Sequence, residues 1–312
     1  MTSMYTAGKK WASTAAVIFV MGACPLAVAA ELGAAFDHEK LSLSVETGFE
    51  HDDNISVSSL DRTTGKSDNA FFMDLSTSYM LLEEKGRELE LTYDFYQTLH
   101  EHIEDFDLQI HTLSALSSWE VDAFDVGLDY SFSKILLGRT SLYKYHSLTP
   151  SLGFGWSDNQ YVRLSYSYQD KDFASTTRDA RQHGIGVDNY YFFMEGLSYL
   201  SFGLRLEDEN TLDSELDYDG VYLRLGLSTP LPVSDLKLQA NYEHFWRDYD
   251  NVTASISDSR NDEQDLISID LIKPLRETLS AKLNFEHTNT HSNLASVDAV
   301  ENRIALSIVA EF

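Results

Sequence analysis

The chain has 312 residues and a formal net charge of −27 at pH 7, because 50 Asp and Glu outnumber 23 Lys and Arg. This acidic excess argues against nucleic acid as a partner, since contacts to phosphate require a basic face. Aromatic residues make up 12% of the chain, which excludes the aromatic-poor composition of a disordered protein. The single cysteine, Cys24, lies in a predicted leader, so the mature chain offers no disulfide, thiol nucleophile or Cys-based metal site.

Residues 1–30 have the pattern of a cleaved secretory signal peptide. A pair of lysines precedes an apolar run at 11–23, and Ala-Val-Ala at 27–29 provides a cleavage site. The run is too short for a transmembrane helix, which needs about 20 residues. The alternative is attachment of a lipid at Cys24, because the residues before it loosely match a lipidation motif. Residues 31–40 are then a short periplasmic segment.

From residue 41 to Phe312, apolar and polar residues alternate in segments bounded by turn-forming residues, which predicts an all-β fold of about 14 strands. Phe124 and Val126, for example, alternate with Asp125. The last strand is apolar on one face and ends at Phe312, which suits a strand that sits in lipid. The predicted strands are centred on 41–49, 71–81, 89–95, 108–119, 124–132, 148–156, 162–168, 185–193, 200–206, 221–227, 236–246, 267–271, 279–285 and 303–312.

The connections between these strands alternate in length. Short turns are predicted at 83–86, 120–123, 157–159, 195–196, 230–232 and 273–276. Long polar connections are predicted at 51–69, 98–105, 169–182, 207–219, 248–262 and 289–300, and 137–142 is a short exception. This alternation is typical of a transmembrane antiparallel up-and-down β-barrel of a bacterial outer membrane, with periplasmic turns, extracellular loops and both termini periplasmic. The alternative is a water-soluble β-sandwich or barrel, whose apolar residues would face inward.

Aromatic side chains gather near the expected membrane boundaries, where amphipathic rings are favoured. The girdle predicted near the short turns contains Trp119, Trp156 and Tyr161. The girdle predicted near the loops contains Tyr143, Tyr145, Tyr166, Tyr168, Phe245 and Trp246.

If the apolar face meets lipid, the opposite face lines the lumen. The residues predicted to line it are Glu46, Glu88, Glu90, Asp94, Asp107, Asp125, Asp129, Arg163, Arg205, Arg224, Lys237, Lys282, Glu286 and Arg303. The acids fall mainly in the first five strands and the basic residues mainly in the seventh to eleventh. We therefore expect an acidic wall opposite a basic wall, which would orient zwitterionic or polar solutes. The alternative is that these charges pair and plug the lumen.

Two clusters of titratable residues could carry other chemistry. His100 and His102, beside acidic residues, are weak candidates for binding a divalent cation, and solvated loop residues are the alternative. His51, followed by Asp52 and Asp53, could act as a general base, but no serine partner is evident. No cofactor-binding motif is present, and the acid-rich loops could bridge divalent cations to lipopolysaccharide. The sequence predicts no enzyme and no cofactor.

The segment 47–55, Thr-Gly-Phe-Glu-His-Asp-Asp-Asn-Ile, resembles the opening of certain bacterial barrels. It is similar to the 14-stranded barrel of surface lipoprotein assembly modifiers and to uncharacterised beta-barrel porin domains. Together with the strand count and Phe312, the resemblance covers residues 41–312. It implies a Gram-negative outer-membrane protein that helps lipoproteins reach the cell surface. Likeness to outer-membrane proteins in general implies that Phe312 is an assembly signal for the barrel-insertion machinery.

The function that we expect from the sequence is a monomeric or loosely oligomeric porin-like channel that transports small polar solutes. Outer-membrane lipid and lipopolysaccharide are its expected surroundings. The alternatives are a translocation helper with a secreted or lipoprotein client, and a structural or adhesive barrel that acts through its extracellular loops.

Overall fold

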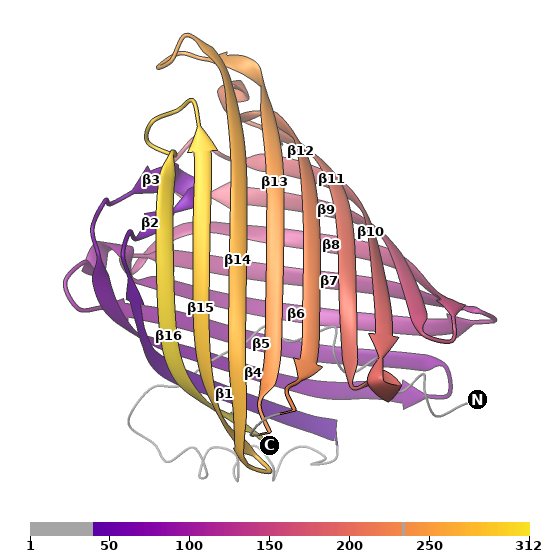
Figure 1. Ribbon diagram of the computed structural model, residues 1–312. Helices are drawn as coiled ribbons and strands as arrows, with labels where there is room; N and C mark the ends of the chain where they lie inside the picture. The colour runs from indigo at the N-terminus through magenta and orange to yellow at the C-terminus, as the bar shows by residue number, and fades with distance from the viewer. Residues whose placement is uncertain (1–39, 233–234) are drawn as a thin grey trace.

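Fourteen antiparallel strands close into a barrel in the computed structural model, which describes residues 40–232 and 235–312 (Figure 1). The strands are β1 (Leu41–Asp52), β4 (Asp68–Glu84), β5 (Arg87–His100), β6 (Leu108–Val121), β7 (Phe124–Leu137), β8 (Thr140–Ser157), β9 (Gln160–Phe173), β10 (Ala180–Phe193), β11 (Ser198–Thr211), β12 (Tyr218–Pro230), β13 (Lys237–Thr253), β14 (Asp258–Arg276), β15 (Leu279–Ser292) and β16 (Ala299–Glu311). Consecutive strands pair, and β1 pairs with β16. The predicted up-and-down barrel is therefore confirmed.

Short helical turns and a small hairpin complete the described structure. The hairpin, β2 (Ser56–Val57) with β3 (Arg62–Thr63), lies between β1 and β4 and was not predicted. Within the described ranges, none of the helices has the length and apolar character needed to span a membrane. The predicted signal peptide at 1–30 lies outside the described residues.

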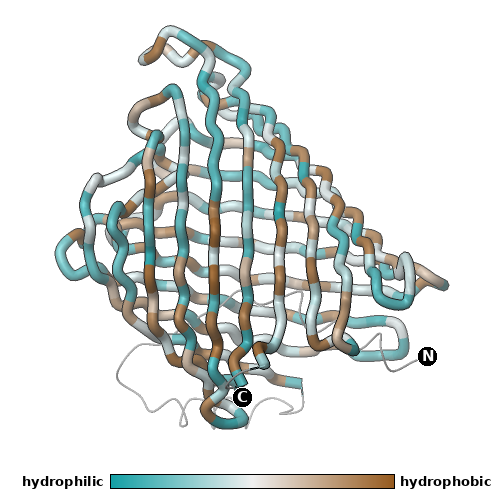
Figure 2. The backbone as a smooth tube through the Cα atoms, viewed as in Figure 1, coloured by the Kyte–Doolittle hydropathy of each residue, from teal (hydrophilic) through white to brown (hydrophobic). Residues whose placement is uncertain are grey.

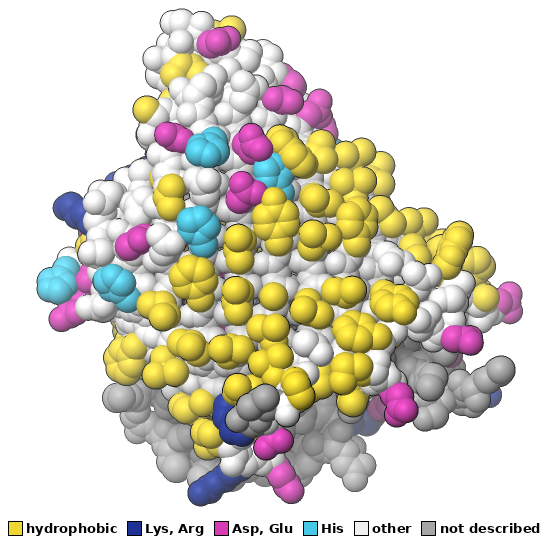
Figure 3. All heavy atoms as spheres, viewed as in Figure 1, with side chains coloured by type: hydrophobic (Ala, Val, Ile, Leu, Met, Phe, Trp, Pro, Cys, Tyr) yellow, Lys and Arg dark blue, Asp and Glu magenta, His cyan; other side chains and the backbone are white. Residues whose placement is uncertain are grey.

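Apolar side chains cover the outside of the barrel. On β1, Phe49 is 70% exposed, whereas Glu46 and Glu50 on the other face of the same strand are buried. On β16, Leu306 is 63% exposed and Ser307 is buried. Figure 2 shows hydrophobic and hydrophilic residues alternating along the strands, and Figure 3 shows a broad hydrophobic band across them. Because successive strand residues point to opposite faces, this pattern is the inverse of a water-soluble barrel and suits a wall that faces lipid.

The pairing of β1 with β16 closes the barrel. Phe49 lies opposite Leu306, and Phe312 exchanges two backbone hydrogen bonds with Leu43, with N···O distances of 2.8 and 3.1 Å. The backbones of the two strands approach closely at Gly48, where an added Cβ would collide with the carbonyl oxygen of Leu306. The closure therefore depends on the last residue of the chain and on a glycine.

The connections differ in length at the two ends of the barrel, but the strands run further than predicted. At the end where β1 begins and β16 ends, four connections are two-residue turns, at 85–86, 122–123, 158–159 and 277–278. The predicted loops at the other end shrink to 174–179, 212–217, 254–257 and 293–298. Polar residues continue the backbone ladder beyond the apolar band, where both faces can be hydrated. The alternating apolar pattern in the sequence therefore indicated only the part of each strand that has an apolar outer face, and not the full length of the strand.

Part of the predicted aromatic girdles is wrong, because three of the tyrosines and one phenylalanine lie on the inner face: Tyr143, Tyr145, Tyr161 and Phe245. The hydroxyl of Tyr161 donates to Asp125 at 3.1 Å. These tyrosines have the opposite parity to the outward residues of their strands, such as Leu148 on β8 and Leu164 on β9. Parity along the strand, and not distance from a turn, decides which face a side chain takes.

Candidate functional site

One part of the interior face is acidic. We define the acidic arc as Asp74, Glu88, Glu90, Asp94, Asp125 and Asp129, which lie on β4, β5 and β7. Neutral groups contact several of these carboxylates: Ser76 donates to Asp94 at 2.7 Å, and Ser118 donates to Glu88 at 3.1 Å. Asp74 is buried, and its Oδ1 has no hydrogen-bond partner among the described residues. Hydroxyl donors leave the formal charge in place, so this arc is electronegative.

The facing part of the interior holds the predicted basic residues, but acids accompany them. Arg163 and Arg224 both contact Asp188, with N···O distances of 3.7 and 3.3 Å. Arg205 contacts Glu207 at 2.7 Å. We call these five residues the paired arc, on β9 to β12. Inward-facing acids on β10 and β11 therefore largely neutralise the expected basic wall. The prediction omitted these acids, although their parity along the strands identifies them as inward-facing.

Aromatic rings and a further arginine extend the paired arc onto β12 and β13. The Arg247 guanidinium lies 4.4 Å from the ring centroid of Phe245 and 4.8 Å from that of Tyr218, and its Nε donates to the Tyr222 hydroxyl at 2.7 Å. Arg205 lies over the Tyr222 ring at 4.7 Å. Cation–π contacts of this kind contribute about 0.5–2 kcal/mol each and hold the side chains in place. Lys237, also predicted on this wall, begins β13.

Charged residues near the closure of the barrel form a third group. Lys282 contacts Glu46 at 2.8 Å. Arg303 contacts Glu286 at 2.9 Å and Glu50 at 3.5 Å. These contacts link β1, β15 and β16 across the closing pair, so the structure brings together four residues of the predicted lumen set, Glu46, Lys282, Glu286 and Arg303.

The connection 53–67, which we call the bridging loop, crosses one mouth of the barrel. In the circular order of strands, β10 is seven positions from β1 in either direction, so the two lie on opposite walls. Asp61, in the bridging loop, contacts Arg178 just before β10, at 2.5 Å. Arg178 also donates to the carbonyl of Ser59 at 3.2 Å. The loop that leaves β1 is therefore fixed at the far wall.

A second arginine holds the same carboxylate. Arg260 on β14 contacts Asp61 at 2.8 Å and makes two further hydrogen bonds to Asp262, at 2.6 and 2.9 Å. Its guanidinium lies over the ring of Tyr249 at 4.4 Å. We call Asp61, Arg178 and Arg260 the latch. Burial raises the pKa of the Asp61 carboxyl, but hydrogen bonds and charge from Arg260 and Arg178 outweigh it and hold that pKa below its usual value.

The two histidines proposed as metal ligands do not share a site. His102 Nδ1 contacts Asp68 at 2.9 Å, and with Glu101 these groups lie close enough to hold an ion. However, Asp68 already accepts backbone N–H bonds from His102 and Ile103, each at 2.8 Å. His100 instead faces Asp107, at 3.4 Å, in the connection before β6. The Asp68 carboxylate therefore holds the connection after β5 in place through hydrogen bonds.

The residues considered for general-base chemistry also separate. His51 lies on the outer face, and its Nδ1 contacts Asn69 Oδ1 at 2.9 Å. Asp52 is buried on the inner face, and Asp53 accepts hydrogen bonds from Asn302 at 2.7 and 2.8 Å. The side chains point to three different partners, so they do not form a catalytic group.

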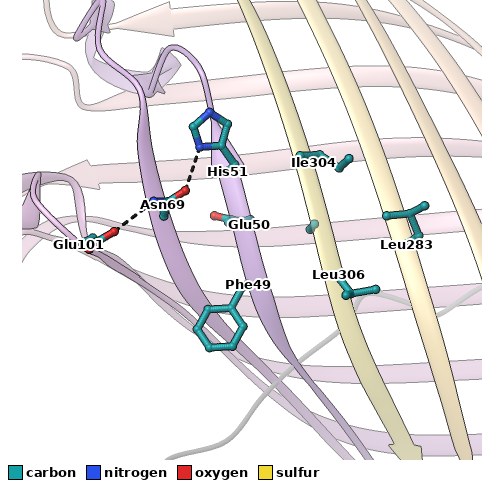
Figure 4. A pocket seen from close by; sticks show the side chains of 9 residues that line it. Phe49, Glu50, His51, Asn69, Glu101, Leu283, Ile304 and Leu306 are labelled. Atoms are coloured by element: carbon teal, nitrogen blue, oxygen red, sulfur yellow. Dashed lines mark hydrogen bonds between the residues drawn. The ribbon is translucent and has the colours of Figure 1, made fainter.

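A hollow of about 520 Å³ lies in the wall where the barrel closes (Figure 4). Its residues come from β1, β4, β15, β16 and the connection after β5: Phe49, Glu50, His51, Asn69, Glu101, Leu283, Ile304, Ala305 and Leu306. His51, Asn69 and Glu101 form a hydrogen-bonded row at its polar edge. Apolar outer-face residues line most of the rest, so the hollow opens on the outer face of the barrel and is separate from the charged interior.

A closed antiparallel barrel with an apolar outside and a charged inside defines the class of β-barrel proteins that span bacterial outer membranes. No protein-family model and no curated protein sequence matches this chain. Solved structures of the same class do match. The anion-selective porin from Comamonas acidovorans matches with a TM-score of 0.51 and 10% identity, over 87% of this chain and 98% of that one.

Two structures of OmpT of Vibrio cholerae also match. The outer-membrane expressed protein has a TM-score of 0.51 and 11% identity, over 87% of this chain and 97% of that one. The in-vitro folded trimer form has a TM-score of 0.52 and 9% identity, over 87% and 99%. At such identities the likeness shows the fold alone. The chain thus resembles Gram-negative outer-membrane porins in fold, and a specific similarity to surface lipoprotein assembly modifiers is not shown.

Proposed function

We propose that the protein is an outer-membrane channel through which small polar solutes diffuse, with a preference for cations. The observation that carries this proposal is the asymmetric charge of the interior. In the acidic arc, Asp94 and Asp125 contact hydroxyl groups, whereas the arginines of the paired arc contact carboxylates. A water-filled passage with one unneutralised sign of charge raises the local concentration of the opposite ion.

The strand number supports a passage of intermediate width. Side chains fill a barrel of about eight strands, and barrels of about 16–18 strands leave wide aqueous channels. Fourteen strands lie between these cases. The bridging loop narrows one mouth, so in this proposal a solute passes the latch first and the acidic arc afterwards. The protein then needs no catalytic step and no cofactor.

We also propose that both chain ends face the periplasm. The start of β1, at Leu41, and the C-terminal Phe312 lie at the barrel end that carries four of the five two-residue turns. Outer-membrane barrels place short turns in the periplasm and longer connections outside the cell. The bridging loop and its latch would then be extracellular, and protease treatment of intact cells would cut at 293–298 and leave the turn at 277–278 intact.

The test of the channel is conductance in a planar bilayer, with the reversal potential measured across a KCl gradient. We expect discrete conductance steps and a cation-selective potential. The triple variant Asp94→Asn, Asp125→Asn, Asp129→Asn should lose most of that selectivity. Glu277→Gln, which removes one acid from a turn, is the control and should behave as the wild type. The proposal is wrong if the wild-type protein forms no channel, or if the triple variant keeps full cation preference.

An export role for surface lipoproteins is the alternative that this experiment separates. A translocation helper would leave a lipoprotein in the periplasm when its gene is deleted, and an adhesive barrel would lose binding when its loops are shortened. Absent channel activity together with a stranded lipoprotein would favour the export role.

A further inference from the structure

Three consecutive hairpins carry the same cluster on the outer face of the barrel. In each hairpin, a histidine on the second strand lies opposite an aromatic residue on the first strand. A tyrosine two residues before that aromatic residue, also on the first strand, contacts the imidazole. The ladder pairs are Phe95 with His111, Phe132 with His146, and Tyr168 with His183, on β5/β6, β7/β8 and β9/β10. Their ring centroids lie 5.0, 4.9 and 5.2 Å apart.

The tyrosines orient these imidazoles. The hydroxyls of Tyr93, Tyr130 and Tyr166 lie 2.8, 2.8 and 2.6 Å from Nδ1 of the respective histidines. A phenol that donates to Nδ1 leaves the ring proton on Nε2, which is then a hydrogen-bond donor. No described residue contacts Nε2 in any of the three clusters. In that tautomer, each cluster has one Nε2–H donor beside two aromatic rings on the outer face of the barrel.

The clusters lie at the border of the apolar band. The next outward residues toward the middle of the barrel are Leu113, Leu148 and Ile185, which are all exposed. On the other side of the histidines, the next outward residues are polar, as at Gln109, Lys144 and Arg181, and the three hairpins close through 101–107, 138–139 and 174–179. Rings at such a border lie among lipid headgroups, with their apolar bodies toward the acyl chains.

Basic side chains add charge to this arc. Lys134 pairs in the ladder with His111 on one side and with Lys144 on the other. Lys144 contacts Asp172 at 2.6 Å, and Arg181, two residues before His183, contacts Asp170 at 3.6 Å. Lys134 has no ion-pair partner among the described residues. Like charges directly opposite each other on one sheet face are unfavourable, so the Lys134–Lys144 pair favours an anion between them.

Two other outward histidines, His244 and His51, have acidic surroundings. His244 lies 2.8 Å from Asp265 and 3.3 Å from Glu263. His51 is linked through Asn69 to Glu101. Figure 3 shows this face of the barrel, with histidines next to acidic side chains above the hydrophobic band. An anion would be repelled here, so the two arcs of the outer face differ in chemistry.

We propose that the outer face of β5 to β10 binds the phosphate-bearing headgroup of a membrane lipid. Lys134 and Lys144 attract the phosphate, the Nε2–H groups of His111 and His146 donate to its oxygens, and the aromatic rings pack on the upper part of the acyl chains. The opposite arc lacks this capacity because acids lie near His244 and His51. This site rests on the proposed position in a membrane, but not on channel activity.

The experiment compares two lipids that share acyl chains and differ only in the phosphate, namely phosphatidic acid and diacylglycerol. Lipid adducts of the folded protein are counted by native mass spectrometry in a sugar-based detergent. We expect at least tenfold more phosphatidic acid bound than diacylglycerol at equal concentration. In the double variant Lys134→Gln, Lys144→Gln, the ratio of bound phosphatidic acid to bound diacylglycerol should fall at least five-fold. Lys134→Arg should keep the wild-type ratio.

The matched control is His51→Gln, His244→Gln on the other arc, which should bind phosphatidic acid as the wild type does. Equal binding of the two lipids, or equal loss in the control variant, would overturn the site. If inorganic phosphate at the same concentration displaces the lipid completely, the site recognises an anion and not a lipid, which also overturns the proposal. Heat-modifiable migration on gels verifies that each variant is folded, and conductance recordings on the same preparations test the channel independently.

Discussion

Release of the latch should change the conductance of the channel. Asp61→Asn removes the charge that faces Arg178 and Arg260, while Arg260 keeps its two hydrogen bonds to Asp262. We therefore count only the contact with Arg178 as fully lost. Hydrogen bonds to charged groups contribute about 1.5–3 kcal/mol, and each 1.4 kcal/mol corresponds to a tenfold change in an equilibrium. The population with a released bridging loop should rise about 10- to 150-fold.

Single-channel recording measures this release. The wild type should show a steady conductance, and Asp61→Asn should show larger steps or frequent transitions to a higher level. Arg178→Gln should have the same effect, because it removes the other side of the same contact. The control is Asp298→Asn, which removes a carboxylate at the same end of the barrel. Among the described residues, the Asp298 carboxylate contacts only His291, at 3.6 Å. Identical traces for Asp61→Asn, Arg178→Gln and the wild type would refute the role of the bridging loop.

Three further outcomes are expected. Deletion of Phe312 removes both backbone hydrogen bonds to β1 and should sharply lower the yield of heat-modifiable barrel, so a normal yield would contradict the assignment of the closing strand. Gly48→Ala should reduce assembly because the new Cβ collides with the backbone oxygen of Leu306, whereas at Gly186 a new Cβ is tight only against the side-chain hydroxyl of Ser165, so Gly186→Ala should assemble normally. Because its folded pKa is lowered, Asp61 stabilises the latch fully above its unfolded pKa of about 3.9, and this contribution disappears as the pH falls through the lower folded value. The contribution of Asp61 to the latch should therefore be equal at pH 7 and 5, so the difference in step size between the wild type and Asp61→Asn should be the same at both, and loss of that difference near pH 6 would contradict this.

The strand pattern could be predicted from sequence because it is local. A period of two, as at Phe124 to Asp129, identifies both the strand and its outward face without knowledge of any partner. Strand ends were predicted less well, since residues such as Asp248 and Asp258 continue a ladder in water and carry no apolar signal. Parity along the strand also places Asp188 and Glu207 inside the barrel, so these two acids of the paired arc carry a signal in the sequence.

The pairing of the interior charges could not be predicted in the same way. Which arginine meets Asp188 depends on the stagger between neighbouring strands, and alternation within one strand contains no information about stagger. The latch joins residues 117 and 199 positions apart in the chain. Nothing near Asp61 in the sequence indicates those partners. The outer clusters, in contrast, had a signal in the similar spacing of Tyr93, Tyr130 and Tyr166, which was not recognised.

The bridging loop also has a mechanical consequence. A thin-walled cylinder resists flattening weakly, because its cross-section can become oval by bending alone, without stretching the wall. A chord fixed to opposite walls resists elongation of the diameter along which it runs. The loop from β1 to the latch near β10 is such a chord, so the barrel should be stiffer along that diameter than across it. Lateral pressure in the membrane would then deform the cross-section in one preferred direction, and the latch would set the limit of that deformation.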